Sequence, residues 1–314
     1  MTPNENASIP RIVVMGGINM DVVANVQRMP EVGETVHGDK FFMTGGGKGA
    51  NQAVAAARLG AEVRMVGRVG DDDFGTTLLD ALRSERIDVS GVAPDPSNGT
   101  GVAVIMVDAS GQNCIAEIYG ANRASDDTQL EAAKRAMEGA DALLLQLETP
   151  PEVSLEAAKY ARSIGVRVIW DPAPAAEMPG DGFSVADFLT PNETEAEALT
   201  GIRVEDADSA REAAEALIAK GVAAAVITLG ERGVYAITDN ERYLVPPFEV
   251  DVVDSVAAGD AFAAGLAVAI SEGLGFRDAL KFGAASGGLA VTKPGARDAM
   301  PFREEVEALL SNAR

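Results

Sequence analysis

The chain has very little cysteine and histidine: its 314 residues include one of each, Cys114 and His37. A single cysteine cannot form a disulfide within the chain, and one histidine and one cysteine are too few for a zinc site. A Ser-His-Asp triad would have to use His37, which we expect to be a solvated surface residue. We expect Cys114 to pack in a hairpin rather than to act as a reactive thiol.

Basic residues are also scarce, with 26 Lys and Arg against 48 Asp and Glu, which gives a net charge of −22. This charge repels nucleic acid and anionic membranes, so neither is an expected partner. It also repels ATP, so a phosphate site would need backbone N–H groups, Mg²⁺ or placed cations. Residues 1–10 lack the apolar segment of a secretory signal, and no apolar run reaches transmembrane length, so we expect a cytoplasmic protein.

Short apolar runs alternate with helical stretches along most of the chain. Such alternation predicts an α/β fold with a mostly parallel central sheet and helices on both faces. The C-terminal third, residues 259–312, should be mainly helical. The expected strands are 11–16, 62–69, 142–146, 166–170, 188–189 and 223–229, and the expected helices between them include 50–59, 74–85, 151–164, 193–199 and 207–220.

Two segments interrupt this alternation. Residues 21–44 have period-two apolar character, and residues 101–118 indicate a hairpin that turns at residues 108–111. We interpret both as strands of a small β-sheet lid that projects from the main body. The prediction is a single domain over residues 1–314, with the lid formed by inserted segments at about 19–45 and 99–120.

The segment Asp254-Ser-Val-Ala-Ala-Gly-Asp260 precedes the apolar helical run 261–270. Small residues before a helix let backbone N–H groups point at an anion, and the helix dipole adds to the attraction. Asp260 in the first turn would lie beside that anion hole, where a carboxylate can act as the base for an attacking hydroxyl in phosphoryl transfer. The alternative is an ordinary helix start with an acidic first turn.

Glycines surround Lys48 and Asn51 in the segment Thr44-Gly-Gly-Gly-Lys-Gly-Ala-Asn51. It is not a P-loop, because Phe42 stands where the first glycine should be and no Ser or Thr follows the lysine. The polar side chains of Lys48 and Asn51 among glycines suit a polar ligand that approaches the backbone closely. A plain glycine-rich turn would have the same sequence pattern.

Three further polar segments follow expected strands. Asn192 and Glu195 could hold a hydrated Mg²⁺ or could simply cap a helix. The segment Thr228-Leu-Gly-Glu-Arg-Gly233 could be a hairpin turn or a nucleotide-binding turn. Asn19 and Asp21 could bind vicinal sugar hydroxyls or form a polar turn.

The order and spacing of these motifs resemble the ribokinase family of carbohydrate kinases from about Arg11 to Leu309. The resemblance includes both family signatures, at 46–51 and 254–260, and is closest to members that act on ribose. It implies ATP-dependent phosphorylation of D-ribose at its 5-hydroxyl, with ATP, Mg²⁺ and a potassium-type cation, in a homodimer that pairs through the lids. The supporting segments are Gly33-Glu-Thr-Val36, Asn51-Gln-Ala-Val-Ala-Ala56, Gln146-Leu-Glu148, Asp171-Pro-Ala-Pro-Ala175 and Pro191-Asn-Glu-Thr-Glu-Ala-Glu197.

The resemblance also implies a role for each matching position. Asp260 would be the base, and the backbone N–H groups of Ala257, Ala258 and Gly259 would form the anion hole. The sugar would be held by Asn19, Asp21, Gly47, Lys48, Gly49, Ala50, Asn51, Glu148 and Asp260. ATP would be held by Asn192, Thr228, Leu229, Gly230, Glu231, Arg232, Gly233, Gly259 and Asp260. Asn192 and Glu195 would organise Mg²⁺ through water, and the monovalent cation would be held by Asp254, Val256, Ala290, Lys293 and Gly295.

Three alanines depart from the family pattern: Ala299 near the cation loop, Ala284 near the adenine position and Ala263 after the proposed base. None removes a proposed catalytic group. A kinase of the same family with another sugar or nucleoside substrate is the nearest alternative. A non-catalytic sugar- or nucleotide-binding regulator would be expected to lack Asp260 or the anion hole, and a dehydrogenase is supported only by the partial glycine pattern at 45–50.

Overall fold

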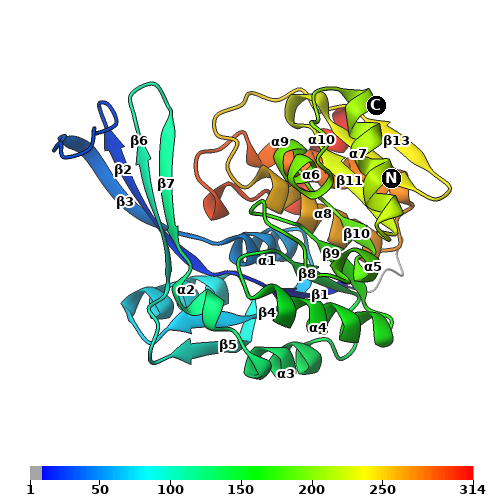
Figure 1. Ribbon diagram of the computed structural model, residues 1–314, viewed down its shortest axis with the longest axis horizontal. Helices are drawn as coiled ribbons and strands as arrows, with labels where there is room; N and C mark the ends of the chain where they lie inside the picture. Colours follow the sequence, from blue (N-terminus) through cyan, green and yellow to red (C-terminus); the bar gives the residue numbers. More distant parts are fainter. Residues whose placement is uncertain (1–8, 314) are drawn as a thin grey trace.

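The computed structural model describes residues 9–313 and contains a nine-stranded sheet (Figure 1). The seven strands from β5 to β11 in sheet order are parallel, and β12 and β13 add an antiparallel edge. This confirms the predicted mostly parallel α/β architecture. In sheet order the strands are β13 (Arg242–Val245), β12 (Val234–Thr238), β11 (Ala224–Thr228), β10 (Phe188–Leu189), β9 (Arg167–Trp170), β8 (Ala142–Leu145), β1 (Arg11–Met15), β4 (Glu62–Gly70) and β5 (Asp88–Asp95).

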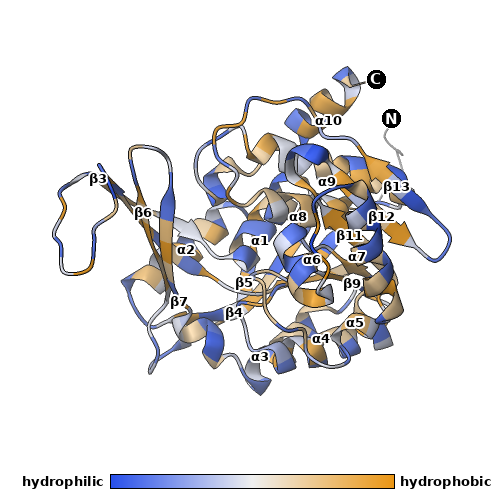
Figure 2. Ribbon diagram, turned by 45° about the horizontal axis from the view of Figure 1, so that its top comes forward, coloured by the Kyte–Doolittle hydropathy of each residue, from blue (hydrophilic) through white to orange (hydrophobic). Residues whose placement is uncertain are grey.

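Helices cover both faces of this sheet, as the alternation predicts. Successive side chains of a strand point to opposite faces, so Ile12 and Val14 of β1 join one core while Val13 and Met15 join the other. Figure 2 shows hydrophobic residues concentrated on central strands such as β11 and hydrophilic residues on outer helices such as α7. The first core includes α1 (Lys48–Arg58), α2 (Asp73–Ser84), α8 (Ala258–Ser271), α9 (Phe276–Ala290) and α10 (Arg303–Asn312); the second includes α3 (Asp127–Ala136), α4 (Pro151–Ser163), α5 (Gly182–Val185), α6 (Glu193–Thr200) and α7 (Ala207–Ala219).

A second, smaller sheet projects from the main body at the left of Figure 1. Its order is β3 (Gly38–Gly46), β2 (Asn19–Val26), β6 (Gly101–Val107) and β7 (Asn113–Ile118). β2 and β6 are parallel, and the two outer pairs are antiparallel. The predicted second sheet is therefore present, and the hairpin turn follows Asp108, whose Oδ1 accepts from the N–H of Ser110 at 2.8 Å.

The register of the second sheet sorts its side chains into two faces. Thr44, Asp21, Ala103 and Glu117 are directly paired across the four strands and so share one face. The residues one position away lie on the opposite face, where apolar side chains are exposed. That face includes Phe41, Met43, Val104 and Ile118 among the exposed apolar residues. It also carries Cys114, which is exposed, so the expectation that this thiol is packed in the hairpin is wrong.

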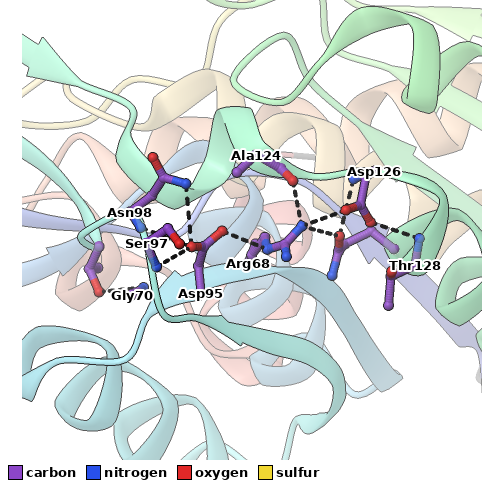
Figure 3. A network of polar contacts seen from close by, with 10 residues as sticks. Arg68, Gly70, Asp95, Ser97, Asn98, Ala124, Asp126 and Thr128 are labelled. Atoms are coloured by element: carbon purple, nitrogen blue, oxygen red, sulfur yellow. Dashed lines mark hydrogen bonds and ion pairs between the residues drawn. The ribbon is translucent and has the colours of Figure 1, made fainter.

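A polar network holds the root of the second sheet against the main sheet (Figure 3). Arg68 of β4 places its Nε 3.0 Å from Asp95 Oδ2 and its Nη1 3.0 Å from Asp126 Oδ2. The other oxygen of Asp95 accepts from the N–H groups of Ser97 and Asn98, each at 2.8 Å. Asp95 is buried, so loss of Arg68 would leave a buried charge without its cation. The network thereby fixes the loop that leads into β6.

Four elements were not predicted from the sequence: β5, α3, the edge strand β13 and the one-turn helix α5. β5 contains Gly91 and Pro94 and alternates buried with exposed positions, which weakens its strand pattern. α3 is a polar helix that buries only Gln129 and Ala133 along its length, so its apolar stripe is too narrow to indicate a helix. Over the described range, 9–313, none of the helices is both long enough and apolar enough to cross a bilayer.

Candidate active site

The candidate site lies at the carboxyl-terminal edge of the parallel strands, where side chains from distant segments meet. Asn19 lies beyond β1, Glu148 beyond β8, Asp171 directly follows β9, and Asn192 follows β10. Thr228 ends β11 and forms an isolated parallel bridge with Asn192. The predicted sugar and nucleotide segments are therefore brought to one edge by the sheet topology.

The glycine-rich segment is a tight connection between β3 and α1. Gly47 has a φ of +88°, and a Cβ there would lie 2.7 Å from both Asn19 N and Gly17 O, so only glycine fits. Lys48 then begins α1, and its backbone N–H donates to Glu148 Oε2 at 2.8 Å. The loop thus brings together Lys48 and Glu148, two residues of the predicted sugar-binding set.

Asp260 lies at the centre of the site in the first turn of α8 and is 2% exposed. Its Oδ2 accepts from Asn51 Nδ2 at 2.9 Å, and its Oδ1 accepts from Gln52 Nε2 at 3.1 Å. Both donors come from α1, so α1 and α8 together orient this carboxylate. Asn51 Oδ1 is buried without a protein partner, which leaves an acceptor for a hydroxyl that enters beside Asp260.

Gln52 is a site residue that the sequence did not identify. Its Nε2 donates to Asp171 Oδ2 at 2.9 Å as well as to Asp260, and its Oε1 accepts from Gln146 Nε2 at 2.6 Å. All four side chains are buried. Gln146 and Asp171 each follow a buried strand directly, and that position at the carboxyl end of a parallel strand is the signal that could have identified them.

Buried carboxylates dominate the electrostatics of the site. Burial raises the pKa of Asp260 and raises the pKa of Asp171 well above its usual range. Burial also raises the pKa of Glu148 to about 8, although the charge of Lys48 opposes this increase. Burial alone would lower the pKa of Lys48, but the surrounding carboxylates, led by Asp260, outweigh it and raise that pKa. Lys48 therefore remains a cation inside the site.

Asn19 and Asp21 lie at the start of β2, beside this centre. Asn19 is buried, and its Oδ1 accepts from Asn122 Nδ2 at 2.6 Å while its Nδ2 donates to Glu117 Oε1 at 3.3 Å. Burial and the charge of Glu117 raise the pKa of Asp21 to about 7, and the nearby charge of Arg297 opposes them. Glu117 and Arg297 were not predicted from the sequence. They come from β7 and from the 3-10 helix η3 (Arg297–Ala299), which are far from Asp21 in the sequence and reach it only through the fold.

The residues of the predicted anion hole lie at the N-terminus of α8. Ala257 precedes the helix with φ 60° and ψ 14°, a left-handed conformation that costs a non-glycine residue roughly 1–2 kcal/mol. Ala258 and Gly259 follow in the first turn, where backbone N–H groups have no intrahelical acceptor. A Cβ at Gly259 would meet nothing within 4 Å, so the space over this turn is open. The N–H of Ala258 makes only a long bond, 3.5 Å to Ser255 O, so a strained turn with weakly used N–H groups lies next to Asp260, and such a turn suits an anion.

Asn192 and Glu195 form a capping box at the start of α6. Asn192 Oδ1 accepts from the N–H of Glu195 at 2.9 Å, and Glu195 Oε2 accepts from the N–H of Asn192 at 2.8 Å. The helix-cap alternative is therefore correct as a local description. Burial raises the pKa of Glu195, and Glu195 in turn is one of the charges that raise the pKa of Asp171. The cap thus lies within electrostatic range of the central carboxylates.

The segment from Thr228 to Gly233 is the turn between antiparallel β11 and β12, built on the 3-10 helix η2 (Gly230–Arg232). Gly230 and Gly233 both have positive φ. Arg232 Nη2 donates to Glu193 Oε1 at 3.0 Å, and Glu231 is exposed. The Leu229 side chain is buried in the core, so it presents no side-chain group to the site.

Asp254 joins the two loops on which the monovalent-cation prediction depends. Its Oδ1 accepts from the N–H of Val256 at 3.0 Å, and its Oδ2 accepts from the N–H of Gly295 at 3.0 Å. Ala290 is the last residue of α9 and lies five positions before Gly295 in the sequence. The Lys293 ammonium donates to Glu305 Oε1 at 2.8 Å. Lys293 could therefore contribute only its backbone to such a site.

Gly49 and Ala50, which belong to the predicted sugar-binding set, contact the backbone of Gly16 and Gly17. The N–H of Ala50 donates to Gly17 O at 3.0 Å, and a Cβ at Gly49 would lie 2.7 Å from the backbone of Gly16. These contacts hold α1 against the turn between β1 and β2. Among residues 9–313, no group of three or more His, Cys, Asp or Glu side chains is arranged to hold a metal ion.

Comparisons with known proteins show what this chain is similar to. The family described as pfkB family carbohydrate kinase matches residues 10–303. The chain is 39% identical over 302 residues to ribokinase of Haemophilus influenzae, covering 96% of this chain and 99% of that protein. It is 35% identical to deoxyribokinase of Salmonella typhi, covering 96% and 98%. The structure of Arabidopsis thaliana ribokinase complexed with ribose and ATP is similar with a TM-score of 0.89 and 34% identity, covering 96% and 99%.

Proposed function

Because this chain belongs to the pfkB family of carbohydrate kinases, we propose that it transfers the terminal phosphoryl group of ATP to the 5-hydroxyl of D-ribose. The observation that carries the proposal is Asp260, a buried carboxylate held by Asn51 and Gln52 at a strained helix N-terminus. The similarity to a ribokinase complexed with ribose and ATP supports the choice of substrates.

In this proposal Asp260 accepts the proton of the attacking hydroxyl. The hydroxyl oxygen forms a bond to the terminal phosphorus, the bond from that phosphorus to the bridging oxygen of ATP breaks, and ADP leaves. The N–H groups of Ala257, Ala258 and Gly259 face the charge on the transferred phosphoryl group. Burial raises the pKa of Asp260, which makes the carboxylate a stronger base than an exposed aspartate.

Sugar recognition is proposed for the polar side chains around Asp260. Asn51 Oδ1 is buried without a protein partner, and a sugar hydroxyl would supply the missing donor. Asp21, Glu148 and Asn19 are further acceptors and donors on the same edge, and Lys48 supplies a cation. A polyhydroxylated substrate fits this set because each hydroxyl can both donate and accept.

ATP is proposed to lie over the turn 228–233 and the N-terminus of α6, where Asn192 and Thr228 are adjacent. The donor set fits Mg²⁺ bound through water, since Glu195 is a carboxylate at the site edge and Mg²⁺ keeps several waters when few protein groups are available. Bound there, Mg²⁺ would neutralise charge on the phosphates. Glu231 and Arg232 would border the nucleotide.

A monovalent cation is proposed between the two loops that Asp254 joins. Asp254 bonds the backbone of Val256 and of Gly295, so an ion bound to this carboxylate and nearby carbonyls would stiffen the segment before Ala257. We also propose a homodimer through the second sheet, because its outer face exposes several large apolar side chains. Both proposals are also what the family resemblance implies.

The test is a sugar panel with ATP, in which ribose and 2-deoxyribose are compared directly. A site built to bond a hydroxyl loses roughly 1–3 kcal/mol when that hydroxyl is missing, so ribose should exceed 2-deoxyribose in kcat/KM by at least about tenfold. The deoxyribokinase relative makes 2-deoxyribose the second candidate substrate. Equal efficiency on both sugars, or a preference for 2-deoxyribose, would refute the assignment to ribose.

A further inference from the structure

Glu117 occupies a position on the second sheet that faces the candidate sugar site. It pairs with Ala103 on β6, and Ala103 pairs with Asp21 on β2, so the three side chains form one row on one face. Adjacent strands lie about 4.8 Å apart, which places the Asp21 and Glu117 backbones about 10 Å apart with only a methyl group between them. The row therefore presents a carboxylate on each side of a small residue.

The contacts of Asn19 confirm that the Glu117 side chain turns toward the site. Asn122 is fully buried, and it binds Asn19 Oδ1 through its Nδ2 while its own Oδ1 accepts from the N–H of Ile18 at 3.0 Å. This arrangement determines which end of the Asn19 amide is the donor, and that donor points to Glu117 Oε1 at 3.3 Å. Glu117 is thus connected through one side chain to the buried floor of the site.

Part of the acceptor capacity of Glu117 is available to a ligand. A carboxylate offers about four lone-pair sites; Asn19 Nδ2 uses one of them, and the Tyr119 hydroxyl, which also hydrogen-bonds this side chain, uses another. In the part of the chain that the structure describes, no Lys, Arg or His nitrogen lies within 4.0 Å of the Glu117 carboxylate, which is exposed. Its charge nevertheless reaches two site residues, because it contributes to the raised pKa values of Asp21 and Glu148.

We propose that Glu117 is a specificity-determining residue that accepts a hydrogen bond from the substrate on the face covered by the second sheet. The inference rests on the proposed function and narrows its substrate class. The preferred substrate carries a hydroxyl donor on the face that lies against β7, and a substrate with only C–H groups there is disfavoured. Asn19 and Asp21 bind from β2, on the other side of β6, so the second sheet contacts the sugar from both sides of Ala103.

The test compares Glu117→Leu, Glu117→Gln and a control, Asp39→Asn. Asp39 is a carboxylate on β3 of the same sheet that bonds Gln27 outside the site, so the control removes the same charge without touching the pocket. The sugar used is the member of a panel of ribose, 2-deoxyribose, arabinose and xylose that gives the highest kcat/KM with the unmodified protein.

Glu117→Leu should raise KM for the sugar by about tenfold or more, with kcat within about threefold and KM for ATP unchanged. Glu117→Gln should raise it by less, since an amide keeps an acceptor without the charge. The melting temperature of Glu117→Gln should not change, because position 117 is exposed and the amide oxygen can still accept from Asn19 Nδ2. Asp39→Asn should match the unmodified protein.

A second readout separates binding from a merely structural role. The charges facing Asp21 are Glu117, Arg297 and Asp260, and removal of Glu117 lowers the pKa of Asp21 from its value of about 7. Asp21 then ionises at lower pH, so the acid limb of kcat/KM for the sugar should move to lower pH in both variants. Unchanged sugar KM together with an unmoved acid limb would overturn the inference while leaving the proposed function intact. Preference for a sugar other than ribose in the unmodified protein would refute the ribose assignment and still allow Glu117 to be tested.

Discussion

Asp260→Asn is the substitution that most directly tests the proposed mechanism. It removes the proton acceptor but keeps the size of the side chain and its position in the first turn of α8. Base catalysis typically supplies about 10²–10⁴ in rate, which corresponds to roughly 2.7–5.5 kcal/mol of barrier. We therefore expect kcat to fall at least about a hundredfold.

The structure also predicts how the folded state responds to this change. Asn51 and Gln52 both donate to Asp260, and an asparagine can accept only one of these bonds with its single oxygen. The Asn51 amide can rotate so that its free Oδ1 accepts from the new NH₂ group, which restores the second bond. The substitution also removes the negative charge that raises the pKa of Asp171 and Glu148, so unfolding free energy should stay within about 1–2 kcal/mol of the unmodified value.

The assay is ADP release under saturating ATP and sugar, with urea unfolding measured on the same samples. The matched control is Asp73→Asn, which changes an exposed aspartate in the first turn of α2 and should leave both measurements unchanged. Asn and Asp begin helices about equally well, so a purely capping role at position 260 would make Asp260→Asn as harmless as the control. Near-normal turnover by Asp260→Asn would therefore refute the mechanism.

Three further predictions concern ions, assembly and pH. If Asp254 and the loop at Gly295 hold potassium, activity should rise when potassium replaces a large organic cation at equal ionic strength, and an unchanged rate would argue against the site. If the second sheet pairs two copies, light scattering should give a dimer that Met43→Glu weakens, whereas a monomer at assay concentration would contradict the proposal. The folded-state pKa values of Asp21 (about 7) and Glu148 (about 8) lie above their unfolded values, so these groups stabilise the fold most at low pH. Urea unfolding without substrates should accordingly show stability falling between about pH 5 and pH 8, and a rise over that window would contradict the burial of these carboxylates.

Much of the fold could be predicted because its signals are local. β1 is a short apolar run, α1 follows directly from glycines, and the hairpin of β6 and β7 carries its own turn residues, so neighbours in sequence were sufficient. β5 was missed for the same reason, because Gly91 and Pro94 remove the local pattern and only pairing with β4 makes the segment a strand.

The candidate site was predictable where a motif lies within a few residues, as at Lys48 and Asp260. It was not predictable where contact depends on register or on the packing of two helices. Gln52 bonds Asp260 across 208 positions of sequence, and Glu117 reaches Asn19 across 98. Nothing in the strand pattern of β7 shows which residue of β2 its carboxylate will meet, because the two strands are separated by β6.

Successive side chains of β2 point to opposite faces of the second sheet, so each position of the strand belongs to one face only. Asn19 and Asp21 lie on the face of β2 that carries the proposed sugar site, while Val22 lies on the opposite face. A point substitution on one face can therefore change selectivity and leave the other face intact, so the two surfaces are free to evolve separately. Deletion of Met20 would instead shift the residues that follow Asn19 by one position, so that Asp21 would move to the opposite face and the apolar Val22 would take its place. Families built on this sheet should tolerate many replacements in β2 and very few changes in its length.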